Sequence, residues 1–486
     1  MEQAIPYAFA RRYGVAVTSE EPLTIACHPE TTPEGLLELQ RLLGSELQFE
    51  QHSTEDFQQI LAKQYEQRSD QAAQMMEDMD ESNLANLAEA LNEPEDLLES
   101  QDDAPIIRLI NALLTEAIKE GASDVHIEPF ETRLSVRFRV DGTLREILQP
   151  PAQVAPLLAS RIKVMAKLDI AEKRLPQDGR ISLKIANRPV DVRVSTLPSG
   201  HGERVVLRLL DKKAGNLNLS DMGMPDKVQE LLNELIHKPH GIILVTGPTG
   251  SGKSTSLYAA LNQLKSPNRN ILTVEDPVEY DLDGIGQTQV NAKIDMSFAR
   301  GLRAILRQDP DVVMVGEIRD LETAQISVQA SLTGHLVLST LHTNSAIGAI
   351  TRLRDMGVES FLLSSSLLAV MAQRLVRVLC SECKRPYTAS REECELMGLD
   401  PNNPPTIYED VGCEHCQSQG YVGRRGIYEV IAVDETLRNM IHDNYAEHQL
   451  QQHAYVNYPS LRQDGWNQVL EGRTTVQEVI RVTRES

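Results

Sequence analysis

The sequence has few aromatic residues and too few basic residues to balance its acids. Aromatic side chains make up 4% of the 486 residues, and 48 Lys and Arg stand against 70 Asp and Glu, for a formal net charge of −22. Nucleic-acid-binding surfaces need clustered positive charge, and those for single strands also need aromatic rings that stack on bases. The composition therefore disfavours a DNA motor, and we expect no nucleic-acid partner.

Long apolar runs and an export signal are also lacking. The longest apolar candidate, residues 361–372, is cut by three serines, whereas a membrane-spanning helix needs about 20 apolar residues. Residues 1–10 lack the basic stretch of a secretory signal. Only six cysteines are present, and four of them form two C-x-x-C pairs, a pattern typical of intracellular metal binding. We expect a cytoplasmic protein with no direct membrane span.

The length and the distribution of charge predict several domains. At about 100 to 200 residues per domain, the chain has room for three or four. Residues 1–66 contain short apolar patches sufficient for a small module. Residues 67–103 carry twelve acidic residues and one basic residue, half of the net charge. We interpret this stretch mainly as a solvated linker, with an acidic docking site as the alternative.

Residues 104–221 predict a small α+β domain. Asp103 as N-cap and Pro105 at the first helical position precede an apolar stripe over residues 106–117, which indicates a helix ending at Gly121. Two hairpins of alternating polarity follow. Residues 134–140 lead into an Asp-Gly turn, and residues 181–194 fold back across Asn187-Arg188. An antiparallel sheet is therefore expected.

The strongest motif is a full G-x-x-x-x-G-K-S phosphate-binding loop. It follows the apolar run 242–246 and precedes a helical stretch from residue 255, as the motif requires. Its glycines let backbone N–H groups surround a phosphate, its lysine reaches the β- and γ-phosphates, and its last serine can hold Mg²⁺. The predicted nucleotide-binding residues are Gly247, Pro248, Thr249, Gly250, Ser251, Gly252, Lys253, Ser254 and Thr255.

Three further apolar runs end in residues suited to phosphate chemistry. Glu317 follows the run 312–315, Glu275 follows another apolar run, and His342 follows a third that ends at Thr340. Ligands bind at the carboxyl ends of parallel strands, so these side chains would converge if the strands are neighbours. Glu317 has the position of a Walker B acid that binds Mg²⁺ through water or polarises the attacking water. Taken singly, Glu275 or His342 could instead be a helix cap or a buried structural side chain.

The two C-x-x-C pairs predict a structural metal site. Cys380 and Cys383 lie before Cys413 and Cys416 within 37 residues, a spacing suited to a tetrahedral Zn²⁺ site. A redox pair is the alternative. The remaining cysteines, Cys27 and Cys394, have no partner pattern and are expected to be ordinary thiols.

Arginines in unusual places also need partners. Arg208 interrupts the apolar run 205–210, so its charge requires a carboxylate or a phosphate. A predicted helix presents Arg300, Arg303 and Arg307 on one face. That pattern usually means a solvated face, which Asp309 and Asp311 could balance, and a phosphate-binding role is conceivable only because a nucleotide site is expected.

From residue 102 onward the sequence resembles the secretion ATPases of type II secretion and type IV pilus systems, and most closely their type II secretion branch. The motifs that carry the resemblance are Gly-Ala-Ser-Asp-Val-His-Ile-Glu-Pro at 121–129, the phosphate loop, the Asp box at 273–279, the Walker B motif at 316–320, the His box from 333–335 through 341–344, and the tetracysteine insert.

This resemblance implies an α/β multidomain fold and a hexameric motor that hydrolyses ATP with Mg²⁺ to drive type II secretion through pseudopilus assembly. It implies a PAS-like domain over 104–221 and a RecA-like ATPase domain over 222–486 with a zinc-binding insert at about 378–426. Arg193 and Arg208 would be arginine fingers, and Glu317 would be the main catalytic carboxylate, with its share relative to Glu275 left open.

The resemblance also implies that the module 1–66 docks on the cytoplasmic domain of an inner-membrane platform protein, so that the ATPase lies peripherally at the inner membrane. Two alternatives remain at this point. The chain could be a pilus assembly ATPase, although its single short module before the acidic linker favours secretion. It could also be a nucleotide-gated scaffold with little turnover, which its several carboxylates and arginines disfavour.

Overall fold

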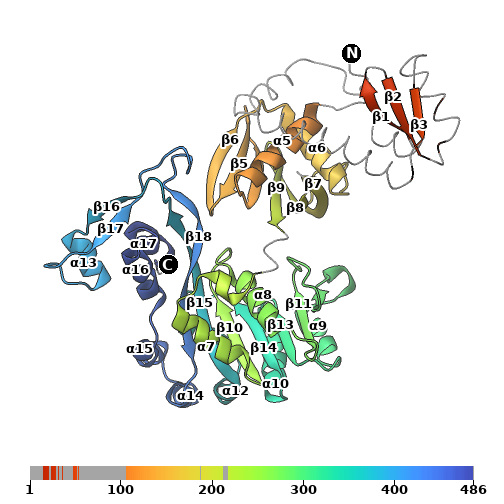
Figure 1. Cartoon of the computed structure of the whole chain (residues 1–486). Helices are drawn as coiled ribbons and strands as arrows, with labels where there is room; N and C mark the ends of the chain where they lie inside the picture. Colours follow the sequence, from red (N-terminus) through yellow and green to blue (C-terminus); the bar gives the residue numbers. More distant parts are fainter. Residues whose placement is uncertain are drawn as a thin grey trace.

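The computed structural model in Figure 1 describes residues 15–20, 23–28, 31, 36, 48–51, 53, 105–185, 188–211 and 217–484. Among these residues the strands form four sheets, of three, six, seven and two strands. The six-stranded sheet is drawn above the seven-stranded sheet in Figure 1. The predicted acidic linker, 67–103, lies outside the described residues.

A three-stranded sheet represents the amino-terminal module. Its strands are β1 (Val15–Glu20), β2 (Leu23–Cys27) and β3 (Gln48–Gln51), with β1 and β2 antiparallel and β2 and β3 parallel. Cys27 is buried there, as a core thiol.

The middle domain is built on the six-stranded antiparallel sheet, in the order β6-β5-β4-β9-β8-β7. Alternate residues of its strands pack with helices α5 and α6 in one apolar core, and the residues between them form a polar face. An α+β domain with an antiparallel sheet is therefore confirmed. The elements are α5 (Pro105–Lys119), β4 (Asp124–Pro129), β5 (Leu134–Val140), β6 (Thr143–Leu148), α6 (Val154–Met165), β7 (Gln177–Ile185), β8 (Arg188–Ser199) and β9 (Gly202–Asp211).

One predicted turn of this sheet is confirmed and the other is displaced. Asp141 and Gly142 connect β5 to β6 with positive φ angles of 47° and 83°, as a two-residue hairpin turn requires. In the second hairpin Arg188 pairs with Ile185, so Arg188 belongs to the strand. The predicted Asn187-Arg188 turn is therefore wrong by one residue, because the alternating pattern fixes the pairing but marks the turn only weakly.

The seven-stranded sheet forms the P-loop domain, in the order β12-β11-β13-β14-β10-β15-β18. All its pairs are parallel except the last, between β15 and β18, which is antiparallel. The strands that lead to Glu275, Glu317 and His342 are therefore parallel neighbours, which meets the condition for these side chains to converge. The strands are β10 (Gly241–Thr246), β11 (Ile271–Glu275), β12 (Gly286–Gln289), β13 (Val312–Val315), β14 (Leu336–Leu341), β15 (Leu367–Leu379) and β18 (Tyr421–Ala432).

Both faces of this sheet are covered by helices, which explains why its strands are apolar throughout. In β10, Ile242 and Leu244 belong to one core, whereas Ile243 and Val245 belong to the other. Helices α7 and α8 cover one face, and α9 to α12 with α14 and α15 cover the other. Their bounds are α7 (Asp226–Ile236), α8 (Lys253–Leu264), α9 (Phe298–Ile305), α10 (Leu321–Leu332), α11 (Ala346–Asp355), α12 (Ser360–Ser366), α14 (Glu435–His442) and α15 (Glu447–Asn457).

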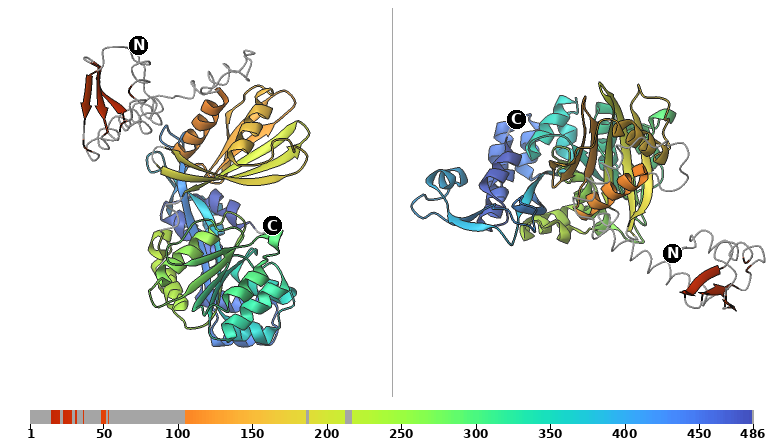
Figure 2. Two further views of the ribbon diagram at one scale, coloured as in Figure 1. Left: turned by 90° about the vertical axis from the view of Figure 1, so that its right-hand side faces the viewer. Right: turned by 90° about the horizontal axis from the view of Figure 1, so that it is seen from above.

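Between β15 and β18 the chain forms an insert that projects to one side of the sheet (Figures 1 and 2). It contains a two-stranded sheet and one helix, and it packs with the last two helices in a separate small core around Trp466 and Cys394. Its elements are β16 (Arg385–Thr388), α13 (Arg391–Met397) and β17 (Thr406–Glu409), and the last helices are α16 (Leu461–Leu470) and α17 (Val476–Thr483). Within the described residues, no helix has both the length and the apolar character needed to cross a membrane.

Candidate active site and metal centre

The phosphate-binding loop connects the central strand β10 to helix α8. The helix begins at Lys253, two residues earlier than predicted. Gly247 and Gly252 have positive φ angles of 150° and 88°. A Cβ at Gly247 would lie 2.6 Å from the carbonyl oxygen of Gln373, and one at Gly252 would lie 2.7 Å from Nε2 of Gln373. Conformation and space therefore both require glycine, because β15 passes directly behind the loop.

Lys253 is held inside this loop. Its Nζ donates hydrogen bonds to the carbonyl oxygens of Gly247 at 2.7 Å and Pro248 at 3.1 Å. Burial lowers the pKa of Lys253 to about 8, Glu317 opposes this shift, and Arg374 adds to it. The ammonium group is thus poorly solvated, and it would be better stabilised by a nearby anion such as a phosphate.

Glu317 follows β13 and faces Arg319 of its own loop and His342 of the loop after β14. Its Oε2 accepts a hydrogen bond from Arg319 Nε at 2.8 Å, and its Oε1 lies 3.2 Å from Nε2 of His342. Burial and the charge of Lys253 lower the pKa of His342, while Glu317 acts to raise it. At neutral pH this imidazole is therefore neutral, and it can orient the Glu317 carboxylate as a hydrogen-bond donor.

Glu275, at the end of β11, is more deeply buried and is bound on both oxygens. Its Oε1 accepts from Thr273 Oγ1 at 2.5 Å and from Gln287 Nε2 at 3.0 Å, and its Oε2 accepts from the hydroxyl of Tyr258. Only 4% of Glu275 is exposed. Burial raises the pKa of Glu275, and the hydrogen bonds from Thr273, Tyr258 and Gln287 oppose this shift. These three donors leave the carboxylate little capacity for a metal or a water.

A cavity of about 560 Å³ lies between the P-loop domain and the polar face of the middle domain. Nearly every residue predicted for the nucleotide site lines this cavity. The exceptions are Gly247 and Pro248, which do not line it. The predicted residues that line it are Arg193, Arg208, Thr249, Gly250, Ser251, Gly252, Lys253, Ser254, Thr255, Glu275, Glu317 and His342.

Arg193 and Arg208 reach this cavity from adjacent strands of the middle domain. They pair directly across β8 and β9, so their side chains lie on the same face of the sheet. Arg208 Nε lies 2.9 Å from Oδ1 of Asp124, a carboxylate of the same domain. Arg193 Nη2 lies 3.9 Å from Glu279 of the P-loop domain. Arg208 thus has the carboxylate partner that the sequence demanded and still lines the nucleotide cavity.

Sequence reasoning missed other cavity residues, including Arg319, Arg424 and Glu279. Arg319 and Glu279 lie within the quoted Walker B and Asp-box motifs and could have been considered. Arg424 lies beyond the tetracysteine motif, where no local signal indicates a nucleotide site.

Arg300, Arg303 and Arg307 are exposed to solvent, as expected for a solvated helix face. None of the three lines the nucleotide cavity. Arg300 pairs with Asp295 and Arg303 with Glu322, and not with the predicted Asp309 and Asp311. Arg307 lies beyond the end of α9 at Ile305. The expected helix is therefore two residues too long.

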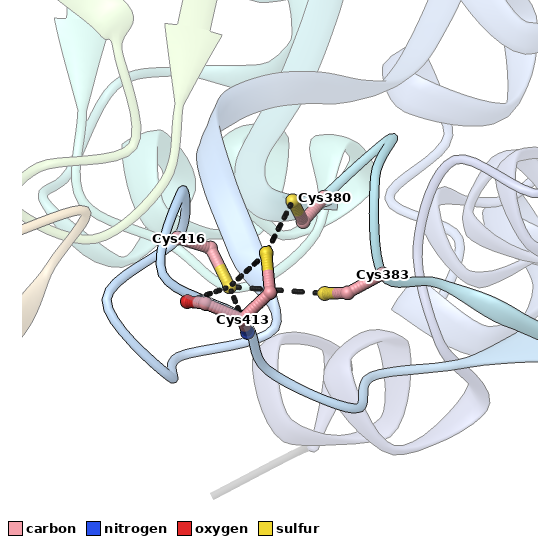
Figure 3. Close-up of side chains that lie close together, drawn as sticks. All are labelled: Cys380, Cys383, Cys413 and Cys416. Carbon is pink, nitrogen blue, oxygen red and sulfur yellow. Dashed lines mark hydrogen bonds between the residues drawn. The ribbon is translucent and has the colours of Figure 1, made fainter.

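The four cysteines of the two C-x-x-C pairs converge as predicted (Figure 3). Their sulfur atoms all lie within 4.8 Å of one another, and the closest are 3.7 to 3.9 Å apart. Tetrahedral Zn–S bonds of about 2.3 Å imply S···S distances of about 3.8 Å, whereas a disulfide requires about 2.05 Å. The backbone N–H groups of Cys413 and Gly420 donate to Cys416 Sγ at 3.2 Å. This donor set fits a tetracysteine metal centre and not a disulfide pair.

Comparisons with known proteins agree with this architecture. A family model described as Type II/IV secretion system protein matches residues 99–481. The chain belongs to this family. A second model, which describes a domain of GSPII protein E, matches residues 4–65.

Relatives in this family are similar over nearly the whole chain. The chain is 62% identical over 483 residues to the type II secretion system protein E of Pseudomonas aeruginosa, which covers 99% of this chain and 96% of that protein. It is 58% identical over 487 residues to the type II secretion system ATPase E of Vibrio cholerae, which covers 99% of this chain and 97% of that protein. This member of the family is therefore a secretion ATPase of the type II branch, and the pilus assembly alternative is not supported.

Solved structures of the same family of folds are also similar. The pilus retraction motor PilT with bound ADP is 26% identical, with a TM-score of 0.53 over 77% of this chain and 97% of that chain. The ATPase DotB of Legionella pneumophila is 21% identical, with a TM-score of 0.58 over 79% of this chain and 97% of that chain, which supports the fold alone. The predicted α/β multidomain ATPase fold is thus confirmed.

Proposed function

We propose that this secretion ATPase is a homohexameric motor that hydrolyses ATP between its middle and P-loop domains and thereby drives type II secretion through pseudopilus assembly. The cavity of about 560 Å³ carries the proposal, because side chains of both domains line it. Bond breaking at a phosphate in this cavity would change the forces on both domains, and the angle between them could change in each cycle. A scaffold that binds ATP without turnover would not need charged groups from two domains.

We assign phosphate binding to residues 247–255. The ammonium of Lys253 would contact the β- and γ-phosphates, and backbone N–H groups of the loop would bind the other phosphate oxygens. Ser254 and Glu317 line the same cavity and offer oxygen donors of the kind that Mg²⁺ prefers. When bound, Mg²⁺ would neutralise charge on the β- and γ-phosphate oxygens.

We assign Glu317 as the carboxylate that polarises the attacking water. Arg319 donates a hydrogen bond to one of its oxygens and His342 lies 3.2 Å from the other, and these two contacts favour one orientation of the carboxylate. Glu275 lines the cavity as well, but its three hydrogen-bond donors favour a supporting role. It would fix α8, through Tyr258, against the strand that ends in the Asp box.

Arg193 and Arg208 are proposed as arginine fingers. Two like charges directly opposite each other on a sheet repel, so a polyanion between them and the phosphate loop would relieve the repulsion. Their guanidinium groups would offset charge that develops on the transferred phosphoryl group.

We further propose that the chain is divided into three domains, at residues 1–66, 104–221 and 222–486, and that residues 67–103 form a linker between the first two.

The tetracysteine centre within the insert at about 378–426 is proposed to hold one structural Zn²⁺, because four thiolates complete a tetrahedral shell.

The amino-terminal module is proposed to bind the cytoplasmic domain of an inner-membrane platform protein. The match of residues 4–65 to a model of a domain of GSPII protein E supports a separate amino-terminal domain that could carry this role. The ATPase would then lie in the cytoplasm, attached peripherally to the inner membrane.

The test compares Arg193→Ala and Arg208→Ala with Arg180→Ala in the full-length protein. Arg180 is a matched control, because it pairs with Arg193 across β7 and β8 but does not line the cavity. We expect both finger variants to bind ATP with near-normal affinity and to lose about 10³-fold or more of kcat and all secretion. Arg180→Ala should retain both activities. Full hydrolysis by Arg193→Ala and Arg208→Ala would remove the middle domain from catalysis.

A further inference from the structure

We propose that Asp124 is a positioning residue that fixes Arg208 by its Nε atom and leaves the two terminal nitrogens of the guanidinium group free for phosphate. This role rests on the proposed function of Arg208 as an arginine finger. The inference goes beyond the arginine-finger proposal because it names the carboxylate that positions this arginine.

Asp124 lies on β4, between an arginine on each neighbouring strand. It pairs with Arg139 of β5 on one side and with Arg208 of β9 on the other. Its side chain is 7% exposed, whereas that of Arg208 is 50% exposed. The carboxylate is therefore part of the sheet's buried polar layer, and the arginine extends from it towards the cavity.

The two carboxylate oxygens have different partners. Oδ1 accepts the hydrogen bond from Arg208 Nε at 2.9 Å. Oδ2 accepts from Ser123 Oγ at 2.8 Å and lies 3.7 Å from Arg139 Nε. Ser123 and Arg139 thus hold the carboxylate in one orientation, and the Nε bond transfers that orientation to Arg208.

The geometry at Arg208 differs from that of Arg180 and Arg204 on the same face. Arg180 binds Asp191 with its terminal Nη2 at 2.9 Å, and Arg204 binds Glu128 with its terminal Nη2. Those contacts occupy an end of the guanidinium group. Within the described residues, the Nε bond to Asp124 is the hydrogen bond found for Arg208. Its outer edge therefore keeps the paired N–H groups that bind a phosphate in bidentate fashion.

A positioning role predicts a specific split between binding and turnover. A misplacement of about 1 Å can cost about 10²-fold in rate, so Asp124→Ala should lower kcat by about 10²-fold. Removal of a negative charge near the cavity should leave ATP binding unchanged or make it tighter. A variant that merely loosened the middle domain would have no reason to bind ATP more tightly.

The experiment is a double-mutant cycle on the full-length protein with Asp124→Ala, Arg208→Ala and the combination. Steady-state hydrolysis gives kcat and KM, a fluorescent ATP analogue gives Kd, and thermal melting reports folding. We expect the double variant to be no slower than Arg208→Ala, because Asp124 acts through that arginine. Asp124→Asn keeps a neutral acceptor and should have an intermediate kcat. Arg180→Ala is the matched control and should keep kcat, because Arg180 lies on the same face, binds Asp191 instead of Asp124 and does not line the cavity.

The outcomes separate the two proposals. If Arg208→Ala retains kcat, the arginine-finger proposal fails, and this inference fails with it. If Arg208→Ala loses kcat while Asp124→Ala and Asp124→Asn keep it, only the inference about Asp124 fails. Additive losses in the double variant would also overturn it. Should Asp124→Ala not fold, Asp124→Asn carries the same test, because its loss must vanish in the Arg208→Ala background.

Discussion

Substitution of each acid by glutamine should distinguish the roles of Glu317 and Glu275. Glu317 contacts only Arg319 and His342 among the cavity groups described above, so an amide can occupy its place without disturbing the core. The change removes the proposed general base. We expect Glu317→Gln to keep ATP affinity within a few fold and to slow hydrolysis by about 10²-fold or more.

For Glu275→Gln the structure predicts mainly a decrease in the free energy of unfolding. In Glu275→Gln the new NH₂ group would face the Tyr258 hydroxyl or the pair of donors from Thr273 and Gln287, and one donor would be left unsatisfied. An unsatisfied buried donor costs about 1 to 3 kcal/mol. Burial raises the pKa of Glu275, so relief of the charge offsets part of this cost.

The assay pairs thermal melting with single-turnover hydrolysis and equilibrium ATP binding. A loss of about 1 kcal/mol should lower the melting temperature of a domain of this size by about 2 to 4 °C. We expect that decrease for Glu275→Gln, with a smaller loss of kcat than for Glu317→Gln. The reasoning would be refuted if Glu275→Gln melted normally but did not hydrolyse ATP while Glu317→Gln remained active.

Three more predictions concern single groups. Lys253→Ala should abolish turnover and weaken ATP binding. In the unchanged protein the affinity for ATP should fall as pH rises above about 8, the pKa of Lys253, because phosphate binds the protonated form of this lysine. ATP-binding titrations of the variant and of the unchanged protein from about pH 7 to 9.5 would check the two predictions. Metal analysis should give one zinc per chain, with Cys380→Ser or Cys413→Ser lowering zinc content and melting temperature together; paired oxidised cysteines without zinc would contradict this. For Glu478, burial alone would raise the pKa, but hydrogen bonds from two arginines lower it to about 2. It should therefore stabilise the fold above pH 4.5, with that stability lost as pH falls towards 2, and Glu478→Gln should flatten acid melting curves over this range.

The local parts of the site could be predicted from the sequence because their signals are local. The phosphate loop needs glycines at fixed spacing between a strand and a helix, and the Asp-Gly pair at 141–142 needs the positive φ angles that the structure contains. The strand ends at Glu275 and Glu317 were identified because buried parallel strands are continuous apolar runs. Neighbouring parallel strands then place these residues at one edge.

The parts that could not be predicted depend on contacts between distant segments. Arg424 enters the cavity from β18, which pairs with β15 although the whole insert separates the two strands in the sequence. The partners of Arg208 and Arg303 come from other elements, Asp124 from β4 and Glu322 from α10. Sequence reasoning could state that Arg208 needed an anion, but no local pattern identifies which carboxylate a folded sheet will place opposite it.

The contacts between the middle domain and the P-loop domain bear directly on how a motor could work. Asp141 accepts a hydrogen bond from the backbone N–H of Gly423 at 2.8 Å and lies 3.4 Å from Nε of Arg424, and Arg193 approaches Glu279 at 3.9 Å. These contacts are polar, and a second cavity of about 300 Å³ lies between the middle domain and the insert. Domains joined by polar interfaces are expected to move relative to each other, unlike domains joined by large hydrophobic interfaces. Arg193, Arg208 and Arg424 all line the nucleotide cavity. Arg193 and Arg208 belong to the middle domain, and Arg424 contacts Asp141 of that domain. We propose that a small rotation of the middle domain would move Arg193 and Arg208 relative to the phosphate loop and would change the contact between Asp141 and Arg424. This motion would link the angle between the domains to the role in hydrolysis proposed for the two arginines.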